Sequence, residues 1–382
     1  MEDVFFSVGN YLQNLYTSRI SALPFSISLS LFIILVCLLG IAELLVFILT
    51  GRVALFIKKK RNADLKNRII SMLANVLVFS DSDNPKAVAA HFRPRFSKIP
   101  LYRGSIRRLL VSEILNNHSN FSGRAAEILR ELYLQLKLDK AARKNLNSRH
   151  WDKQIEAIRE LTEMSVKDEC ERIFKYTNSR NPHLRIEAQI SYIKLCMDNP
   201  FRFFDHIREP ILEWHQMVLF EVITKTETMA RPRFLQWLNS SNDSLVALCL
   251  KLIEFYQQFD AQPYLIYLIN HANLSIRAAA IEILGRMEAE MAESHFISAY
   301  PYQPQKIKVK ILNALGSISS GKSLNFLNSQ ADSKEFPVKI AAIRAIKAHR
   351  QEGRRVLTAL LNEVAAPDKA IIKHVLDERV RV

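Results

Sequence analysis

The strongest constraint on the fold of this chain is a set of similar segments that return every 31 positions. The segments that begin at Arg277, Lys308 and Lys339 read RAAAIEILGRM, KVKILNALGSI and KIAAIRAIKA. The same step, once shortened to 30, continues in both directions and gives nine anchor positions in all: Gly123, Gln154, Arg185, His215, Val246, Arg277, Lys308, Lys339 and Ala370. A fixed period of this length is the signature of a repeat architecture.

The residues after each anchor follow the periodicity of a helix. After Arg277, for example, a small residue stands at Ala280 and bulky aliphatic residues stand at Ile281 and Leu284. Offsets of three, four and seven residues lie on one helix face, and the small residue allows a neighbouring helix to approach closely. Each anchor therefore predicts an amphipathic helix.

Helix start signals precede the anchors, as at Asn181-Pro182, where an N-cap residue is followed by proline at the first helical position. Between successive anchored helices there is room for one more helix and two short turns, so each repeat is predicted to be a helical hairpin. Hairpins of this kind bury their apolar faces only by stacking. The chain has only 9 glycines, whereas barrels and nucleotide-binding sheets need glycine at turns and phosphate loops. We therefore expect an all-α chain that forms an α-solenoid of about nine hairpins.

These repeats resemble HEAT repeats, and their short period is most similar to the HEAT-like subgroup named after phycobilisome lyases. The resemblance covers residues 104–382 and is strongest from Arg277 to Ala348, whereas His215, Val246 and Gln189 depart from the pattern. It implies a concave face that binds another protein. It also permits an enzyme, a chromophore lyase or isomerase.

An apolar run from Ile27 to Leu49 contains one ionisable residue, Glu43. As a helix it is about 34 Å long, enough to cross a hydrocarbon core of about 30 Å. The chain starts Met-Glu-Asp rather than with a basic segment, which favours a retained anchor over a cleaved signal peptide. The predicted organisation is a short N-terminus (1–24), a transmembrane helix (25–51), a basic juxtamembrane segment expected to be helical (52–103) and the repeat array (104–382).

The residues that flank this run predict its orientation, because Lys and Arg concentrate on the cytoplasmic side of membrane spans. Only Arg19 is basic before the run, whereas seven Lys and Arg residues follow it between positions 52 and 68. We therefore expect a single-pass protein of the inner (plasma) membrane, with its N-terminus outside and the array in the cytoplasm. Cys37, in the span, and Cys170, Cys196 and Cys249, on apolar helix faces, are expected to be isolated reduced thiols.

Glu43 has two interpretations. An acid within a span costs about 2.5–3.5 kcal/mol on insertion scales. It either lies near the cytoplasmic end, reaching water or taking up a proton, or contacts another membrane helix, which would make it an intramembrane partner contact.

The net charge of +15 is concentrated beside the predicted span. Residues 58–122 hold 13 basic and 4 acidic side chains, a balance that favours an anionic lipid surface. The candidates for membrane-surface contact are Lys58, Lys59, Lys60, Arg61, Arg93, Arg95, Arg107 and Arg108. The alternative is a solvated, irregular first repeat. Nucleic acid is a weaker candidate partner because the span keeps it out of reach.

The sequence offers little chemistry. It has no phosphate-binding GxxxxGK[ST] or GxGxxG motif and no HExxH or CxxC metal motif. We expect no catalytic residue, cofactor, metal or small-molecule substrate. The basic anchors Arg185, Arg277, Lys308 and Lys339 form a repeat ladder, expected to be mainly structural, with an acidic-peptide groove as the alternative.

Together these features predict a membrane-anchored, non-enzymatic scaffold or regulatory subunit that binds a protein partner, expected to be a membrane protein such as a polytopic glycosyltransferase or transporter. The short period and scarce long loops favour a bacterial origin. Two alternatives stay open: a lyase or isomerase of the phycobilin-lyase-like class, and a nucleic-acid-binding HEAT-like protein.

Overall fold

The computed structural model describes residues 24–78, 84–226, 231–364 and 366–377, and every regular element within these ranges is a helix. The chain divides into two compact units, residues 1–136 and residues 137–382. The predicted start of the array at residue 104 thus lies within the first unit. The all-α solenoid is confirmed in its main feature, since each of the nine anchors lies in a helix or caps one.

The first unit is built around α2 (Phe25–Leu77), a single helix of 53 residues. Its remaining helices are α3 (Pro85–Ser97), α4 (Gly104–Asn120) and α5 (Arg124–Gln135). Ile69, Leu73 and Val76 lie on the α2 face that packs against these helices, and each is at most 1% exposed. Residues 52–77, which the sequence assigned to a separate segment, continue α2 without a break.

The N-terminal part of α2 has a different character. Leu29–Val53 is 25 residues long with a mean hydropathy of 3.1, and none of its most apolar stretch is buried. Among the described helices it alone is long and apolar enough to cross a membrane, a property that a signal sequence near the N-terminus would share.

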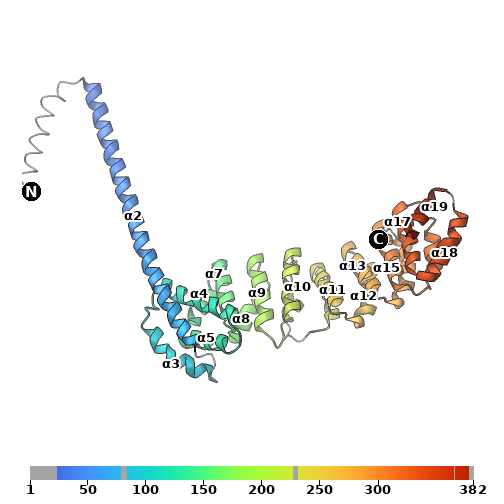
Figure 1. The fold of residues 1–382 in the computed structure, drawn as a ribbon, viewed down its shortest axis with the longest axis horizontal. Coiled ribbons are helices and arrows are strands. Elements are labelled where there is room, and N and C mark those ends of the chain that lie inside the picture. The colour runs from blue at the N-terminus through green and yellow to red at the C-terminus, as the bar shows by residue number, and fades with distance from the viewer. Residues whose placement is uncertain (1–23, 79–83, 227–230, 365, 378–382) are drawn as a thin grey trace, which may run out of the picture. The chain divides into compact units, whose positions relative to one another are not determined.

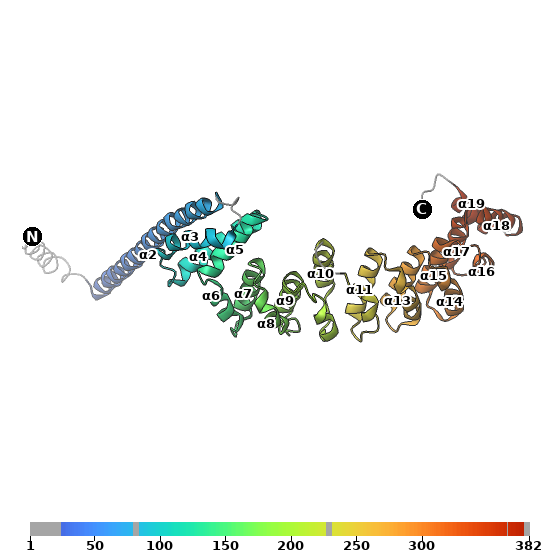
Figure 2. The same ribbon diagram turned by 90° about the horizontal axis from the view of Figure 1, so that it is seen from below.

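The second unit is a row of hairpins, visible in order in both views (Figures 1 and 2). Its anchored helices are α7 (Trp151–Glu163), α9 (Pro182–Leu195), α10 (Glu213–Lys225), α11 (Asp243–Phe255), α13 (Leu274–Arg286), α15 (Gln305–Ile318), α17 (Phe336–Ala348) and α19 (Ala366–Leu376). The first helices of the hairpins are α6 (Asp139–Leu146), α8 (Cys170–Phe174), η3 (Arg202–His206), η4 (Phe234–Trp237), α12 (Gln262–Tyr267), α14 (Glu293–Ala299), α16 (Leu324–Gln330) and α18 (Arg350–Glu363).

The backbone repeats with the same period as the sequence. Gln257, Glu288, Ser319 and Arg350, each 31 residues after the one before, are left-handed, with φ of 50°, 49°, 45° and 52°. Each follows an anchored helix, where a left-handed residue ends the helix and turns the chain. The equivalent positions after α9 and α10 are Cys196 (φ −102°) and Thr226 (φ −86°), so the regular turn is missing from two successive repeats.

The C-terminal repeats approach one another very closely. A Cβ atom added to Gly285 of α13 would lie 2.9 Å from Cα of Ala314 in α15, and one added to Gly316 of α15 would lie 2.8 Å from Cα of Ala345 in α17. Small residues six and eight positions after the anchors, rather than at the third position that the sequence pattern indicated, therefore permit this backbone contact between neighbouring hairpins.

This contact predicts that Gly316→Ala destabilises the array, although alanine is the better helix former. The added methyl group meets backbone rather than a movable side chain, and such overpacking costs about 1–3 kcal/mol. Thermal unfolding of the full chain in detergent, followed by near-UV circular dichroism, should show a lower midpoint. Gly104→Ala is the control, because nothing lies within 4 Å of its added Cβ. An unchanged Gly316→Ala midpoint would contradict the close packing.

Candidate functional site

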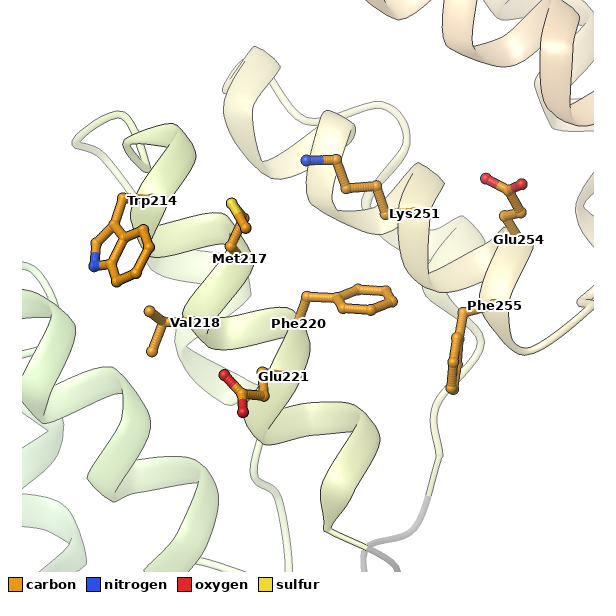
Figure 3. A pocket seen from close by; sticks show the side chains of 8 residues that line it. All are labelled: Trp214, Met217, Val218, Phe220, Glu221, Lys251, Glu254 and Phe255. Carbon is orange, nitrogen blue, oxygen red and sulfur yellow. The ribbon is translucent and has the colours of Figure 1, made fainter.

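The second irregular repeat, that of α10, borders an open groove between α10 and α11 (Figure 3). The contacts of α10 with α9 and α11 are sparser than those among α13, α15 and α17. The groove encloses about 700 Å³. Its lining residues come from α10 and α11: Trp214, Met217, Val218, Phe220, Glu221, Lys251, Glu254 and Phe255.

The groove presents large apolar side chains to solvent. Trp214 is 69% exposed, Met217 60% and Phe255 53%. Trp214, Met217 and Val218 stand at offsets of zero, three and four on one face of α10. The Phe220 ring points toward α11 and meets the Phe255 ring edge-on, with the ring centroids 5.4 Å apart. A cluster of exposed Trp, Met and Phe side chains is typical of a surface that another molecule covers.

At two junctions between other anchored helices, the corresponding positions hold ion pairs. Two and five residues after the anchors, Arg159 of α7 pairs with Glu187 of α9 at 2.6 Å, and Lys310 of α15 pairs with Glu282 of α13. On α10 these two positions hold Met217 and Phe220. The groove thus presents apolar side chains at positions that join neighbouring repeats by ion pairs at the α7–α9 and α13–α15 junctions.

Both acids that line the groove are already paired. Glu221 accepts a hydrogen bond of 2.6 Å from Lys225, which lowers the pKa of its carboxyl, and Glu254 pairs with Arg286 at 2.5 Å. Lys251 donates to the neutral Oε1 of Gln216 at 3.3 Å, and no carboxylate among the described residues pairs with it. The groove therefore combines an apolar floor with one ammonium group that lacks a counter-charge.

A buried aromatic cluster lies in the segments that precede α10 and α11. Phe201 packs edge-on against Phe204 and Phe234, and the Trp237 indole N–H donates to Asp205 Oδ1 at 2.7 Å. These residues lie in the segments that precede α10 and α11, so they fix the position of both helices. On α10 itself, burial and the nearby Arg185 and His183 lower the pKa of His215.

The ladder residues are occupied by contacts within the array. Arg185 donates to the carbonyl of Ser179 at 2.7 Å, and Arg277 donates to the carbonyl of His271 at 2.7 Å and to Gln303 of the next repeat at 2.6 Å. Lys308 lies 5.4 Å from the Tyr300 ring centroid, and Lys339 pairs with Asp368 at 2.8 Å. Each ladder residue therefore has a contact within the array.

The basic candidates of the first unit lie on three helices, α2, α3 and α4. Arg93, Arg95 and Arg108 are exposed and Arg107 is half-buried, on α3 and α4. Lys60 is exposed on α2, and the side chains of Lys58, Lys59 and Arg61 lie outside the described residues. Glu43 is exposed within the apolar part of α2.

The expectation of isolated thiols is wrong for two cysteines. Cys170 at the start of α8 and Cys196 at the end of α9 form a disulfide, with their Cα atoms 5.8 Å apart. The hairpin brings the two helix ends together, a proximity that the spacing of 26 residues did not reveal. Cys37 and Cys249 are free. Burial raises the pKa of the Cys249 thiol.

Sequence reasoning missed the groove, although a signal was present. Comparison of equivalent positions would have shown Met217 and Phe220 on α10 where two other junctions carry the pairs Arg159–Glu187 and Lys310–Glu282. Among the described residues, no group of three or more His, Cys, Asp or Glu side chains gathers as a metal site requires.

Comparisons with known proteins give limited guidance. No family model and no curated protein sequence matches this chain. Kap121p is 14% identical over 81% of this chain, with a TM-score of 0.34, and this chain spans 37% of its length. A crystallised engineered protein is 13% identical over 80% of this chain and 97% of its own (TM-score 0.33). Human deoxyhypusine hydroxylase in complex with glycerol is 11% identical over 83% of this chain and 97% of its own, with a TM-score of 0.27.

These scores are low, and the fold assignment rests on the helices themselves. Stacked hairpins with a 31-residue period in both sequence and backbone define a HEAT-like helical-repeat protein.

Proposed function

We propose that this chain is a membrane-anchored scaffold or regulatory subunit that binds a protein partner through the groove between α10 and α11. The observation that carries this proposal is the exposure of Trp214, Met217 and Phe255 around a groove of about 700 Å³. Trp and other aromatic side chains dominate the binding energy of protein interfaces. A partner with apolar side chains and one carboxylate to face Lys251 would complement the groove.

The membrane anchor in this proposal is the apolar part of α2. Val53 ends the apolar stretch, and Glu43 lies ten residues before it, about 15 Å along the helix axis. This distance is about half of a 30 Å hydrocarbon core, so Glu43 is far from the nearer interface. The position favours a contact with another membrane helix, and a polytopic glycosyltransferase or transporter is the kind of partner that could provide one. Anchoring would also raise the local concentration of any partner in the same membrane.

The chain acts in this proposal without a catalytic centre of its own. In the groove, Glu221 and Glu254 are held by Lys225 and Arg286, so they do not converge on a common reacting point. This arrangement supports binding over the lyase or isomerase chemistry that the phycobilisome-lyase resemblance permits.

The proposed test compares two surface variants in affinity purification from native membranes. Trp214→Ser combined with Met217→Ser should weaken capture of the partner by tenfold or more, because it removes two exposed apolar anchors. Tyr267→Ser combined with Tyr302→Ser is the matched control, since these rings are 78% and 87% exposed and lie outside the groove. Equal capture by both double variants would refute the groove as the binding surface. Glu43→Ala in the same assay tests the intramembrane contact.

The proposed cytoplasmic location of the array makes a prediction about its cysteines. Cytoplasmic thiols are kept reduced, so the disulfide that Cys170 and Cys196 form in the structure should be reduced to two thiols in the cell. Cells quenched in acid and labelled with a polyethylene-glycol maleimide under denaturing conditions should yield four adducts per chain, one for each of its 4 cysteines.

The variant Cys170→Ser distinguishes the reduced pair from the oxidised pair. If the pair is reduced in the cell, the variant loses one thiol and yields three adducts instead of four. If the pair is oxidised in the cell, the unaltered chain yields two adducts and Cys170→Ser raises the number to three. That result would place the array in an oxidising compartment and reverse the proposed orientation.

A further inference from the structure

A second, smaller pocket lies in the first unit, between α2 and the end of α3. It encloses about 190 Å³. Leu65, Arg68, Ile69 and Met72 line it from α2, at offsets of zero, three, four and seven that place them on one helix face. Arg95, Lys98, Ile99 and Pro100 close the other side. The sequence pattern did not assign Arg68 or Lys98 to any site.

The pocket is lined by three cationic side chains and by apolar side chains. Arg68, Arg95 and Lys98 are its charged lining residues, and no carboxylate lines it. Asp64, one turn before Arg68 on α2, forms no ion pair with it, whereas the neighbouring Lys66 pairs with Glu113 at 3.0 Å. Arg95 is held over the buried Phe92 ring, with its guanidinium carbon 4.8 Å from the ring centroid. Like charges gathered around a concave surface favour the entry of an anion.

We propose that this pocket binds a phosphate group of a small soluble molecule. Two guanidinium groups and an ammonium group are the donors that recognise phosphate oxygens, and arginine can do so with two parallel hydrogen bonds. At about 30 Å³ per water molecule the pocket has room for about six waters. That volume accepts one or two phosphoryl groups and is below the range of about 300–1,000 Å³ found for drug-sized ligands.

The length of α2 distinguishes a soluble phosphate from the headgroup of a bilayer lipid. Arg68 is 15 residues beyond Val53, about 22 Å along the helix axis. If α2 crosses a membrane as proposed above, a tilt of about 40° still leaves Arg68 about 17 Å from the hydrocarbon core. The headgroup region is only about 5–8 Å thick on each side. The binding site itself does not depend on the proposed function; only this choice of ligand source does.

Isothermal titration with sodium pyrophosphate tests the proposal on the full chain in an uncharged detergent at low ionic strength. We expect saturable binding at one site, weakened by about tenfold or more in Arg68→Gln and in Lys98→Gln through loss of a charge-assisted hydrogen bond. Both residues are exposed, so neither change should prevent folding. Arg108→Gln, an exposed arginine of α4 outside the pocket, makes the same charge change and should alter the affinity by less than about twofold.

Two results would overturn the proposal. Absence of saturable binding, or equal losses in all three variants, would show that the charges attract anions only diffusely.

A second titration, in lipid nanodiscs of phosphatidylcholine with and without phosphatidic acid, distinguishes the two sources of the phosphate group. Unchanged pyrophosphate affinity supports a soluble ligand, whereas its loss in the acidic nanodiscs would assign the pocket to a lipid headgroup. A failed groove test leaves these outcomes unaffected, because the two sites share no residue.

Discussion

The close stacking of the anchored helices is the interaction on which the array depends. Each hairpin has an apolar face that it cannot bury alone, and the small residues at fixed offsets allow the next helix to reach it. In the C-terminal repeats the approach is limited by backbone atoms, at Gly285 against Ala314 and Gly316 against Ala345. This requirement explains why the period is so regular: a helix that shifted by one residue would place a larger side chain at the contact. The left-handed residues at Gln257, Glu288, Ser319 and Arg350 follow from the same geometry, because each chain reversal must deliver the next hairpin to the same place.

Against this regularity, α9 and α10 both end without the left-handed residue. In addition, α10 carries Met217 and Phe220 at positions where ion pairs join α7 to α9 and α13 to α15. The looser contacts of α10 leave its apolar side chains uncovered. A departure from a repeat that costs packing and exposes Trp214 is hard to explain by stability alone, and partner binding supplies a reason for it.

The helices and their register could be predicted from the sequence because the repeated offsets of small and aliphatic residues depend on local helix geometry. Each of the nine anchors lies in a helix or caps one. The features that the sequence did not reveal depend on distance in space. Cys170 and Cys196 meet only when the hairpin closes, and Arg68 and Lys98 share a pocket only because α3 folds back on α2. The groove lies between these cases, since alignment of the repeats sets Met217 and Phe220 beside the paired charges of α7, α9, α13 and α15.

The most direct test of the central claim is photo-crosslinking in intact cells. Benzoylphenylalanine is placed at Met217 or Phe255 in the groove, and at Tyr302, which is 87% exposed, as the control. The account predicts that Met217 and Phe255 crosslink to the same partner protein in the membrane fraction and that Tyr302 does not. Absence of an adduct at both groove positions, or the same adducts from Tyr302, would contradict the claim that this groove is where the scaffold holds its partner.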